Sequence, residues 1–505
     1  MPFQVSAMGI SSAAELAKIG DRALVRSEAY VGGRWVGAPS GKTFDVVDPG
    51  TLDRIATVAD MDADDVRRAV DAAHDAFAGW RATTAKQRAG LLRKWFDLIV
   101  ASKDDLARLL TLECGKPLGE AAGEVLYGAS FVEWFAEEAK RADGDVFQSP
   151  AAGTRIVTIK QPVGVAGIIT PYNFPIAMVT RKVGAALAAG CTVVVRPAHE
   201  TPLSALALCE LAERAGIPPG VLNAVTCSAD GTPAVGRELT TNPLVRKVSF
   251  TGSTPVGKLL MGQAASTMKR LSLELGGNAP FIVFEDADLD AAAEQLVFCK
   301  FRNSGQTCIC ANRIFVHESV YADFVDRFVA LVTAKLRVGH GLAEGTTFGP
   351  IITERGAAKV EDQLRRAVAA GARVVLGGRR PEGLAVRGHF FEPTVLVDVP
   401  ADVPMSCEET FGPLCPIFSF SSEDEVIRRA NSVDVGLAGY FYSRDVARAF
   451  RVAEALEVGM VGVNTGAIGS EVMPFGGVKE SGMGREGSRY GIAEYLNIKS
   501  VVFSI

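Results

Sequence analysis

The chain has 505 residues, of which 48% are hydrophobic and 22% are charged, and it carries a net charge of −5. This length exceeds what one hydrophobic core usually serves, so two or more domains are expected, and the composition excludes a disordered chain. Mild negative charge without a block of Lys and Arg argues against nucleic acid or an anionic membrane surface as a partner.

The chain shows no sign of export or membrane insertion. Residues 163–180 are the longest apolar candidate, but Pro171, Asn173 and Pro175 interrupt them before the ~20 residues that a spanning helix needs. The first 20 residues lack the basic start and apolar stretch of a secretory signal. Nine cysteines, an odd number, and five scattered histidines favour neither a disulfide framework nor a zinc site. We expect a cytoplasmic protein, although an organelle-targeting N-terminus stays open.

Helical patterns come first and are followed by an alternating block. Residues 62–112 are rich in helix formers, with Asp62 as a plausible N-cap. Between residues 163 and 276, short β-branched runs alternate with helical segments. The expected strands are 163–170, 192–196, 222–225 and 246–250, and the expected helices are 176–190 and 203–215. Such alternation is typical of βαβ units and a parallel sheet.

A second alternating block begins near residue 281. Its expected strands are 281–284, 314–316, 373–376 and 461–463, with helices at 320–336 and 446–456. Two further strands, 154–160 and 495–504, fall outside both blocks, where strands often find partners on another subunit. The sequence therefore predicts an α/β protein with two parallel-sheet domains of comparable size.

Three segments supply side chains suited to attack on a carbonyl group. They are PYNFP at 171–175, LELGGN at 273–278 and FRNSGQTCIC at 301–310. Cys308 offers a nucleophilic thiol, Glu274 a carboxylate for proton transfer and Asn173 an amide that can stabilise an oxyanion. Each residue alone more often has a structural role, but their combination favours an enzyme.

A candidate phosphate-binding turn accompanies these residues. No GxGxxG follows a strand, so the usual dinucleotide fingerprint is absent. Instead FTGSTPVG at 250–257 leads from a strand into a helix. Backbone amides near Gly252 and Ser253 can face a phosphate there, because a helix N-terminus attracts anions.

Taken together, these segments resemble the aldehyde dehydrogenase superfamily over roughly residues 28–505. LELGGNAP, KFRNSGQTCIC at 300–310 and PFGGVK at 474–479 are most similar to the succinate-semialdehyde dehydrogenases. The resemblance implies an aldehyde dehydrogenase-like α/β fold whose parts are a Rossmann-like cofactor-binding domain (28–145 and 164–276), a catalytic domain (277–485), a small β oligomerisation arm (146–163 and 486–505) and an N-terminal extension (1–27). It also implies a homodimer or homotetramer.

The resemblance assigns roles to individual residues. Cys308 attacks the aldehyde, Glu274 activates the thiol and the deacylating water, and Asn173 with the Cys308 N–H holds the oxyanion. Glu486 is a candidate proton relay, Cys310 a candidate redox switch or simply a packed side chain, and no metal is required. The implied cofactor contacts are Thr170, Pro171, Tyr172, Arg196, Pro197, His199, Gly252, Ser253, Gly257, Leu275, Gly276, Glu409 and Phe411.

One segment departs from the family pattern and bears on the cofactor. Most members read Lys-Pro-Ala-Glu where this chain has RPAH at 196–199. A glutamate at the fourth position would repel a 2′-phosphate, whereas His199 would not, and Arg196 is a better bidentate phosphate ligand than lysine. We therefore expect NADP to be preferred, with NAD as the open alternative.

The expected substrate is an aldehyde with a carboxylate at its far end. Arg181, Arg302 and Ser470 match the positions that bind this carboxylate in the succinate-semialdehyde dehydrogenases, and a guanidinium suits such an anion. We expect oxidation of succinate semialdehyde to succinate through a thiohemiacetal and a thioester. Glutarate or 2-oxoglutarate semialdehyde would satisfy the same arginines. Glu274 argues against acyl release to coenzyme A, and a catalytically silent scaffold is the rival from another class.

Overall fold

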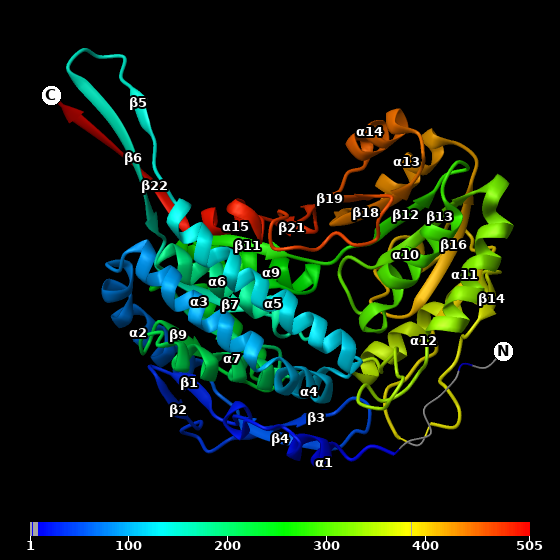
Figure 1. Cartoon of the computed structure of the whole chain (residues 1–505), viewed down its shortest axis with the longest axis horizontal. Coiled ribbons are helices and arrows are strands. Elements are labelled where there is room, and N and C mark those ends of the chain that lie inside the picture. The colour runs from blue at the N-terminus through cyan, green and yellow to red at the C-terminus, as the bar shows by residue number, and fades with distance from the viewer. Residues whose placement is uncertain (1–2, 4–8, 385) are drawn as a thin grey trace.

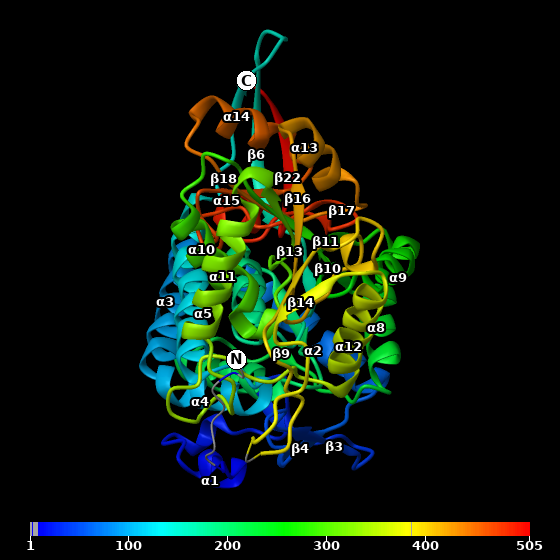
Figure 2. The ribbon, with the colours of Figure 1, turned by 90° about the vertical axis from the view of Figure 1, so that its right-hand side faces the viewer.

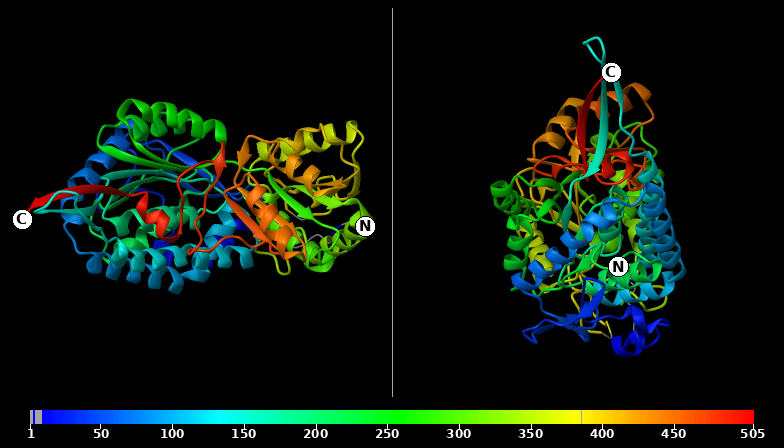
Figure 3. Two further views of the ribbon diagram at one scale, coloured as in Figure 1. Left: turned by 90° about the horizontal axis from the view of Figure 1, so that it is seen from above. Right: turned by 90° about the vertical axis from the view of Figure 1, so that its left-hand side faces the viewer.

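Two α/β lobes lie side by side, and a slender β arm projects from one of them (Figure 1). The computed structural model describes residue 3, residues 9–384 and residues 386–505. Seen from above, the two lobes and the arm follow one another along the long axis of the molecule (Figure 3).

The first lobe contains an eight-stranded sheet in the order β2-β1-β9-β8-β7-β10-β11-β21. Its strands are β1 (Ala29–Val31), β2 (Arg34–Val36), β7 (Val165–Ile169), β8 (Thr192–Arg196), β9 (Leu222–Ala224), β10 (Val245–Thr251), β11 (Arg270–Glu274) and β21 (Gly482–Met483). The five strands from β9 to β11 are parallel, and pairings that involve β1, β2 or β21 are antiparallel. Continuous apolar runs in β7 and β8 match their complete burial between helical layers.

Helices cover both faces of this sheet. One face carries α2 (Ala63–Arg81), α8 (Thr232–Thr241) and α9 (Thr254–Ala264), and the other carries α3 (Ala85–Ala101), α4 (Lys103–Cys114), α5 (Leu118–Glu138), α6 (Ala177–Ala189) and α7 (Pro202–Ala215). Val194 packs with α2 and α8, whereas Val193 and Val195 face the opposite layer, as strand alternation requires. Asp62 caps α2 in a capping box with Asp65, so the predicted N-cap is confirmed.

The second lobe contains a seven-stranded sheet in the order β14-β15-β16-β13-β12-β18-β19. Its strands are β12 (Ala279–Val283), β13 (Ala311–His317), β14 (Arg373–Leu376), β15 (Thr394–Val397), β16 (Leu414–Phe420), β18 (Ala438–Tyr442) and β19 (Met460–Val463). One face carries α10 (Leu289–Phe301) and α11 (Tyr321–Lys335), and the other carries α12 (Glu354–Ala369), α13 (Glu423–Asn431) and α14 (Val446–Ala455). The prediction of two α/β lobes is confirmed.

One predicted strand of the second block differs from its neighbours in direction. β14 runs antiparallel to β15, while the other strand pairs of this sheet are parallel. Among the described residues between these two strands, 377–384 and 386–393, there is no helix. A chain that returns without a crossover helix pairs antiparallel.

The two strands outside the blocks pair with each other. β22 (Leu496–Ser504) pairs antiparallel with β6 (Thr154–Pro162) over nine residue pairs, and β5 (Val146–Gln148) completes a three-stranded sheet. The outer part of this sheet projects from the first lobe (Figure 1), and its tip is the uppermost part of the molecule in Figure 2. Its exposed apolar side chains are Val146, Phe147, Ile159, Ile498, Val502, Phe503 and Ile505.

Smaller elements complete the described chain. They are α1 (Ser12–Ala17), the hairpin of β3 (Thr43–Val47) and β4 (Arg54–Ala59), the pair β17 (Val435–Gly436) and β20 (Val478–Lys479), and α15 (Ser488–Ala493). Within the described ranges, none of the helices combines the length and apolar character needed to cross a membrane.

Candidate active site

Cys308 follows a backbone turn of unusual conformation. Asn303, Ser304 and Gly305 have φ values of 49°, 57° and 78°, so three consecutive residues are left-handed. A left-handed non-glycine residue costs about 1–3 kcal/mol and persists only where its surroundings hold it. At Gly305 a Cβ would lie 2.3 Å from the Gly412 carbonyl oxygen, so only glycine fits. The thiol is therefore presented by a turn that must be held in place.

The Cys308 thiol holds its proton at neutral pH. Burial raises the pKa of Cys308 to about 12; the nearby Arg181 acts in the opposite direction, and Glu409 and Glu274 raise the pKa further. Because only a thiolate attacks a carbonyl, this cysteine needs a base within reach.

Glu274 ends β11 and is a candidate for that base. Its side chain is only 2% exposed, and neither carboxylate oxygen has a hydrogen-bond partner among the described residues. Burial and then the neighbouring Glu486 raise the pKa of Glu274 well above its usual value, against the effect of Arg181. A carboxylate that keeps its proton to higher pH than an ordinary glutamate is suited to general base catalysis.

The loops that carry Glu274 and Cys308 are in close contact. Gly277 lies three residues after Glu274, and a Cβ there would lie 2.7 Å from the Cys308 carbonyl oxygen. Glycine at this position lets the two loops approach, and the charge of Glu274 reaches the thiol.

Asn173 is held against the loop that carries Cys308. Its side-chain Nδ2 donates to the Gln306 carbonyl at 3.0 Å, and its own carbonyl accepts from Asn303 Nδ2 at 3.0 Å. The second N–H of the amide remains available for an oxyanion. The structure therefore brings together the three residues predicted to carry out the chemistry.

Glu486, two residues before α15, forms a buried charge cluster with two cations of α6. Its carboxylate forms ion pairs with Arg181 and Lys182, and Lys182 Nζ also donates to Thr251 Oγ1 at 2.6 Å. Burial raises the pKa of Glu486, but the two cations more than offset this, so the pKa lies below its usual value. Glu486 is thus an ionised partner of Arg181, and its role as a proton relay stays a prediction.

Two of the three predicted substrate residues, Arg181 and Arg302, lie near the thiol. Arg302 is half-buried, with its guanidinium carbon 5.2 Å from the ring centroid of Phe174, and Arg181 lies 4.4 Å from that of Phe475. Arg181 and Arg302 both lower the pKa of Cys308, so both lie near the sulfur. Ser470 lies half-buried in the loop after β19.

Tyr127 on α5 also belongs to this group and was not predicted. Burial raises its pKa, whereas Arg181 and Arg302 lower it, and its hydroxyl would lie 3.3 Å from a Cβ at Gly469, beside Ser470. Nothing in the local pattern of the α5 sequence distinguishes this tyrosine from an ordinary helix residue.

Predicted cofactor contacts lie at the carboxyl ends of neighbouring parallel strands. Thr170, Pro171 and Tyr172 follow β7, and Arg196 to His199 end or follow β8, which is where α/β sheets bind nucleotides. Thr170 Oγ1 is buried with no partner among the described residues. Tyr172 meets Phe411 of the second lobe edge to face, with ring centroids 6.0 Å apart.

The glycine-rich turn and Glu409 form the other side of this region. Gly252 and Ser253 precede α9, and the Ser253 side chain makes no capping bond, so the helix N-terminus is open to an anion. Gly257 packs against Leu275, where a Cβ would lie 2.4 Å from Leu275 Cδ2.

Glu409 meets the backbone of the Gly276-Gly277 turn. Its carboxylate accepts from the Gly277 N–H at 3.2 Å, and a Cβ at Gly276 would lie 2.9 Å from its Oε2. Burial raises the pKa of Glu409 to about 7. The Gly252 turn, the orphaned Thr170 hydroxyl and Glu409 together suit a dinucleotide.

Arg196 and His199 have different surroundings. Arg196 is 7% exposed, and its guanidinium donates to Cys227 Sγ at 3.3 Å and to Thr232 Oγ1. His199 is half-buried, and burial followed by Arg196 and Arg355 lowers its pKa despite Glu200. Glu200, which sequence reasoning overlooked, places a carboxylate oxygen 3.2 Å from His199 Nδ1. A 2′-phosphate here would meet a cation, a neutral imidazole and a nearby carboxylate.

Cys310, two residues after the nucleophile, is buried. Its thiol donates to the Lys300 carbonyl at 3.6 Å, and all nine cysteines carry free thiols. A redox switch at Cys310 stays a prediction. Across the described residues, no group of three or more His, Cys, Asp or Glu side chains is arranged to hold a metal ion.

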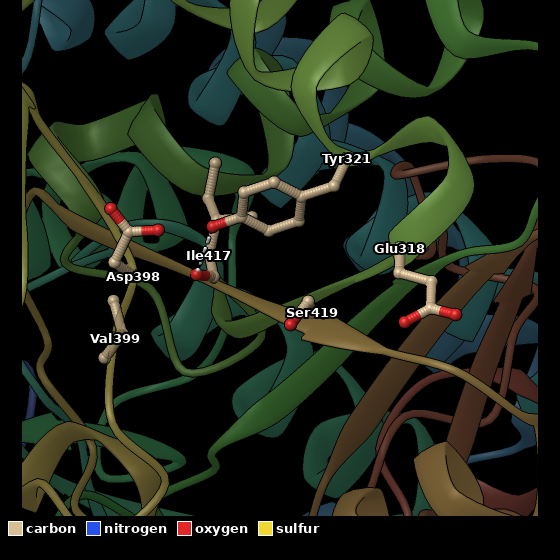
Figure 4. Close-up of a pocket in the computed structure, with 6 residues that line it drawn as sticks. All are labelled: Glu318, Tyr321, Asp398, Val399, Ile417 and Ser419. Atoms are coloured by element: carbon tan, nitrogen blue, oxygen red, sulfur yellow. Dashed lines mark hydrogen bonds between the residues drawn. The ribbon is translucent and has the colours of Figure 1, made fainter.

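A surface pocket of about 410 Å³ lies on the second lobe, apart from these residues (Figure 4). It is lined by Glu318, Tyr321, Asp398, Val399, Ile417 and Ser419. The Tyr321 hydroxyl is committed to the Ile417 carbonyl at 3.0 Å, and none of the predicted site residues lines the pocket.

Comparison with known proteins identifies the family. The model of the aldehyde dehydrogenase family matches residues 35–501. A succinate-semialdehyde dehydrogenase (NADP(+)) of Escherichia coli (strain K12) is 57% identical over 482 residues, which cover 95% of this chain and 98% of that protein. A glutarate-semialdehyde dehydrogenase of Pseudomonas aeruginosa is 58% identical over 479 residues, which cover 95% and 98%.

A solved structure agrees with these matches. The crystal structure of an E. coli NADP-dependent enzyme superposes with a TM-score of 0.95 and 56% identity, covering 97% of this chain and 100% of that one. The fold and the family expected from the sequence are confirmed. This chain belongs to the aldehyde dehydrogenase family.

Proposed function

We propose that this protein oxidises succinate semialdehyde to succinate with NADP as the preferred cofactor. The observation that carries the proposal is the position of Arg181 and Arg302, both close enough to Cys308 to lower its pKa. A substrate whose aldehyde reaches the sulfur while its far carboxylate meets these guanidinium groups satisfies both ends. The similar E. coli succinate-semialdehyde dehydrogenase supports this assignment.

The first half of the reaction forms a bond to sulfur. Glu274 accepts the thiol proton, and Cys308 Sγ adds to the aldehyde carbon to give a thiohemiacetal. The free N–H of the Asn173 amide and the Cys308 backbone N–H stabilise the oxyanion. A nicotinamide dinucleotide held at this site would supply the two-electron oxidation by accepting the hydride of the thiohemiacetal carbon, so that the acyl group would remain on Cys308 as a thioester.

The second half breaks that bond. Glu274 first releases the thiol proton to solvent and then removes a proton from water, and the hydroxide adds to the thioester carbonyl. The carbon–sulfur bond breaks to release the carboxylic acid, and the leaving Cys308 sulfur takes its proton back from Glu274. Asn173 again stabilises the oxyanion, because both tetrahedral intermediates place it at the same position. Glu486 keeps Arg181 oriented by its buried ion pair.

The proposed cofactor contacts are the residues at the sheet edge. The amides near Gly252 and Ser253 would hold the pyrophosphate, and Glu409 and Phe411 would hold the nicotinamide ribose. Arg196 bonds to no carboxylate of the described residues, which favours a 2′-phosphate there. The NADP(+) designation of the E. coli relative supports the same preference. Glu200 opposes it, so NAD remains the competing cofactor.

The proposal extends to organisation and location. It comprises an extension at 1–27, a cofactor-binding domain at 28–145 and 164–276, a catalytic domain at 277–485 and an arm at 146–163 and 486–505. The exposed apolar side chains of the arm support a homodimer or homotetramer. Nine free thiols suit a reducing compartment such as the cytoplasm.

Glutarate semialdehyde is the second candidate substrate. A relative of 58% identity is named for it, and the same arginines would hold its carboxylate. One methylene changes binding in a pocket by only ~1–3 kcal/mol, so the two substrates compete closely. A silent scaffold is disfavoured, because a buried Glu274 without partners costs stability that only a function explains.

Substituting Arg302 by alanine tests the substrate assignment. We expect kcat/KM for succinate semialdehyde to fall about 10- to 100-fold, as loss of a charge-assisted hydrogen bond implies, and kcat/KM for butanal to change less than about 3-fold. The measurement follows absorbance of the reduced cofactor with each aldehyde, with glutarate semialdehyde, and with NADP and NAD separately. Arg327→Ala, an exposed arginine of the same lobe, serves as the control.

Two results would contradict this proposal. An equal loss on butanal and succinate semialdehyde would remove Arg302 from substrate recognition. A kcat/KM ratio strongly in favour of NAD would reverse the cofactor preference.

A further inference from the structure

Three charged side chains near the start of α5 take no part in the mechanism above. Lys116 precedes the helix, and Glu120 and Glu124 lie one turn apart on the same face of it. Lys116 and Glu124 are almost fully buried, and Glu120 is half-buried. We call these three residues the α5 cluster. Burying a charge costs free energy unless the charge is paired, so the partners of these side chains indicate their role.

Lys116 connects the cluster to the loop of Asn173. Its ammonium forms an ion pair with Glu124 and donates to the Asn173 carbonyl at 2.8 Å. The same nitrogen lies 3.8 Å from the ring centroid of Phe174, whose ring also faces Arg302 at 5.2 Å. Lys116 therefore fixes both the oxyanion donor and the aromatic ring beside the substrate arginine.

Glu124 completes the N-terminus of α6. Its Oε1 accepts from the Ile176 N–H at 2.9 Å and from the Ala177 N–H at 3.3 Å. The N-cap residue of α6 supplies no capping bond of its own, so this carboxylate takes that place. Because α6 carries Arg181, the capping interaction also orients the substrate side of the site.

Glu120 holds the strained turn that presents the nucleophile. Its Oε2 accepts from the Asn303 N–H at 2.7 Å, at the first of the three left-handed residues before Cys308. Asn303 in turn donates to the Asn173 carbonyl, the same oxygen that Lys116 contacts. The cluster thus reaches the Asn173 loop and the Cys308 loop from one rigid helix.

We propose that Lys116, Glu120 and Glu124 are positioning residues that set the geometry between the Asn173 amide and the Cys308 thiol. They act through these two residues and contact no reacting atom. The inference rests on the proposed chemistry of Cys308, but not on the identity of the aldehyde. It predicts that the loss of one of these contacts slows the chemical steps more than it weakens substrate binding.

The test uses two reactions of the full-length protein. One is oxidation of succinate semialdehyde with NADP. The other is hydrolysis of 4-nitrophenyl acetate, in which Cys308 Sγ bonds to the acyl carbon, 4-nitrophenolate leaves and water releases acetate from the thioester. The ester needs the thiol and the oxyanion donor, but neither a dinucleotide nor a carboxylate-bearing substrate. Failure of the substrate assignment is therefore separated from failure of this inference.

Glu120 contacts the turn before Cys308 directly, so it is the first residue to substitute. For Glu120→Ala we expect kcat in both reactions to fall about 10- to 100-fold while KM changes less than about 3-fold, since positioning affects the transition state. Glu120→Gln keeps a carbonyl oxygen for the Asn303 N–H and should recover kcat to within about 5-fold of the original. Glu133→Gln, on an exposed part of α5, is the matched control and should change neither reaction.

A double variant covers the case in which Glu120→Ala does not fold. Lys116→Met with Glu124→Gln removes both buried charges together, so no lone charge is left, yet it removes the bond from Lys116 to Asn173. We expect a melting temperature close to that of the original protein and the same fall in kcat. The inference is overturned if either folded variant retains kcat in both reactions, or if Glu120→Gln loses as much activity as Glu120→Ala.

Discussion

At the scale of residues, the site holds two acidic groups whose environments both favour the protonated form. Burial raises the pKa of the Cys308 thiol to about 12 and the pKa of Glu274 well above its usual value. In the resting protein the nucleophile is therefore not preformed. Reaction requires Glu274 in its ionised form, which makes the pH dependence of the rate a direct report on this carboxylate.

The pH dependence of kcat/KM supplies a prediction for Glu274. A base must be unprotonated to act, and the raised pKa means that Glu274 stays protonated to higher pH than an ordinary glutamate. A plot of kcat/KM against pH should therefore rise along a limb that lies above the usual pKa range of carboxylates. In Glu274→Gln the rate should be lower by about 10²- to 10⁴-fold and this limb should vanish.

The control for this experiment is an exposed glutamate of the same region. Glu480 pairs with Lys258 at the surface, and Glu480→Gln should leave the rising limb of the pH–rate profile unchanged. A Glu274→Gln profile that keeps the original limb would assign the titration to another group.

At the scale of elements, the sequence predicted the regular parts of the structure well. Repeated apolar runs determine β7, β8 and the helices around them, because each must bury a face against its neighbours. The direction of β14 could not be read this way, since periodicity locates a strand but says nothing of its partner. The same holds for the pairing of β6 with β22, whose partners are over 300 residues apart.

The residues of the candidate site likewise fall into two groups, those that the sequence could predict and those that it could not. Cys308, Glu274 and Asn173 could be found because short motifs carry their chemistry. Glu120, Tyr127 and the other partners of these motifs could not, because their roles depend on contacts between distant segments; Glu120 meets Asn303 across 183 residues. Such side chains look ordinary in a helix until the fold brings their partners to them.

At the scale of the whole molecule, contacts within a single chain leave apolar side chains of the arm exposed. Ile498 and Val502 lie on the same face of β22 and are 71% and 64% exposed. Exposed apolar side chains on a projecting strand favour burial against another copy. This supports the proposed homo-oligomer.

Charged residues on the arm should break the oligomer without unfolding the chain. For Ile498→Glu with Val502→Glu we expect a lower mass in sedimentation velocity, because burying two carboxylates at an interface is costly. The melting transition should persist, since neither side chain belongs to a core cluster. Val368→Glu, an exposed apolar residue on α12, is the control, and an unchanged mass in the arm variant would contradict the assignment of the interface.

The measurement that tests the central claim most directly is the mass of the acylated protein. When the protein is quenched in acid during turnover of succinate semialdehyde with NADP, part of it should have gained about 100 Da, the mass of a succinyl group held as a thioester. Peptide analysis should place this mass on Cys308, and the substitution Cys308→Ser should abolish it. An unmodified protein, or a succinyl group on a different residue, would contradict the account.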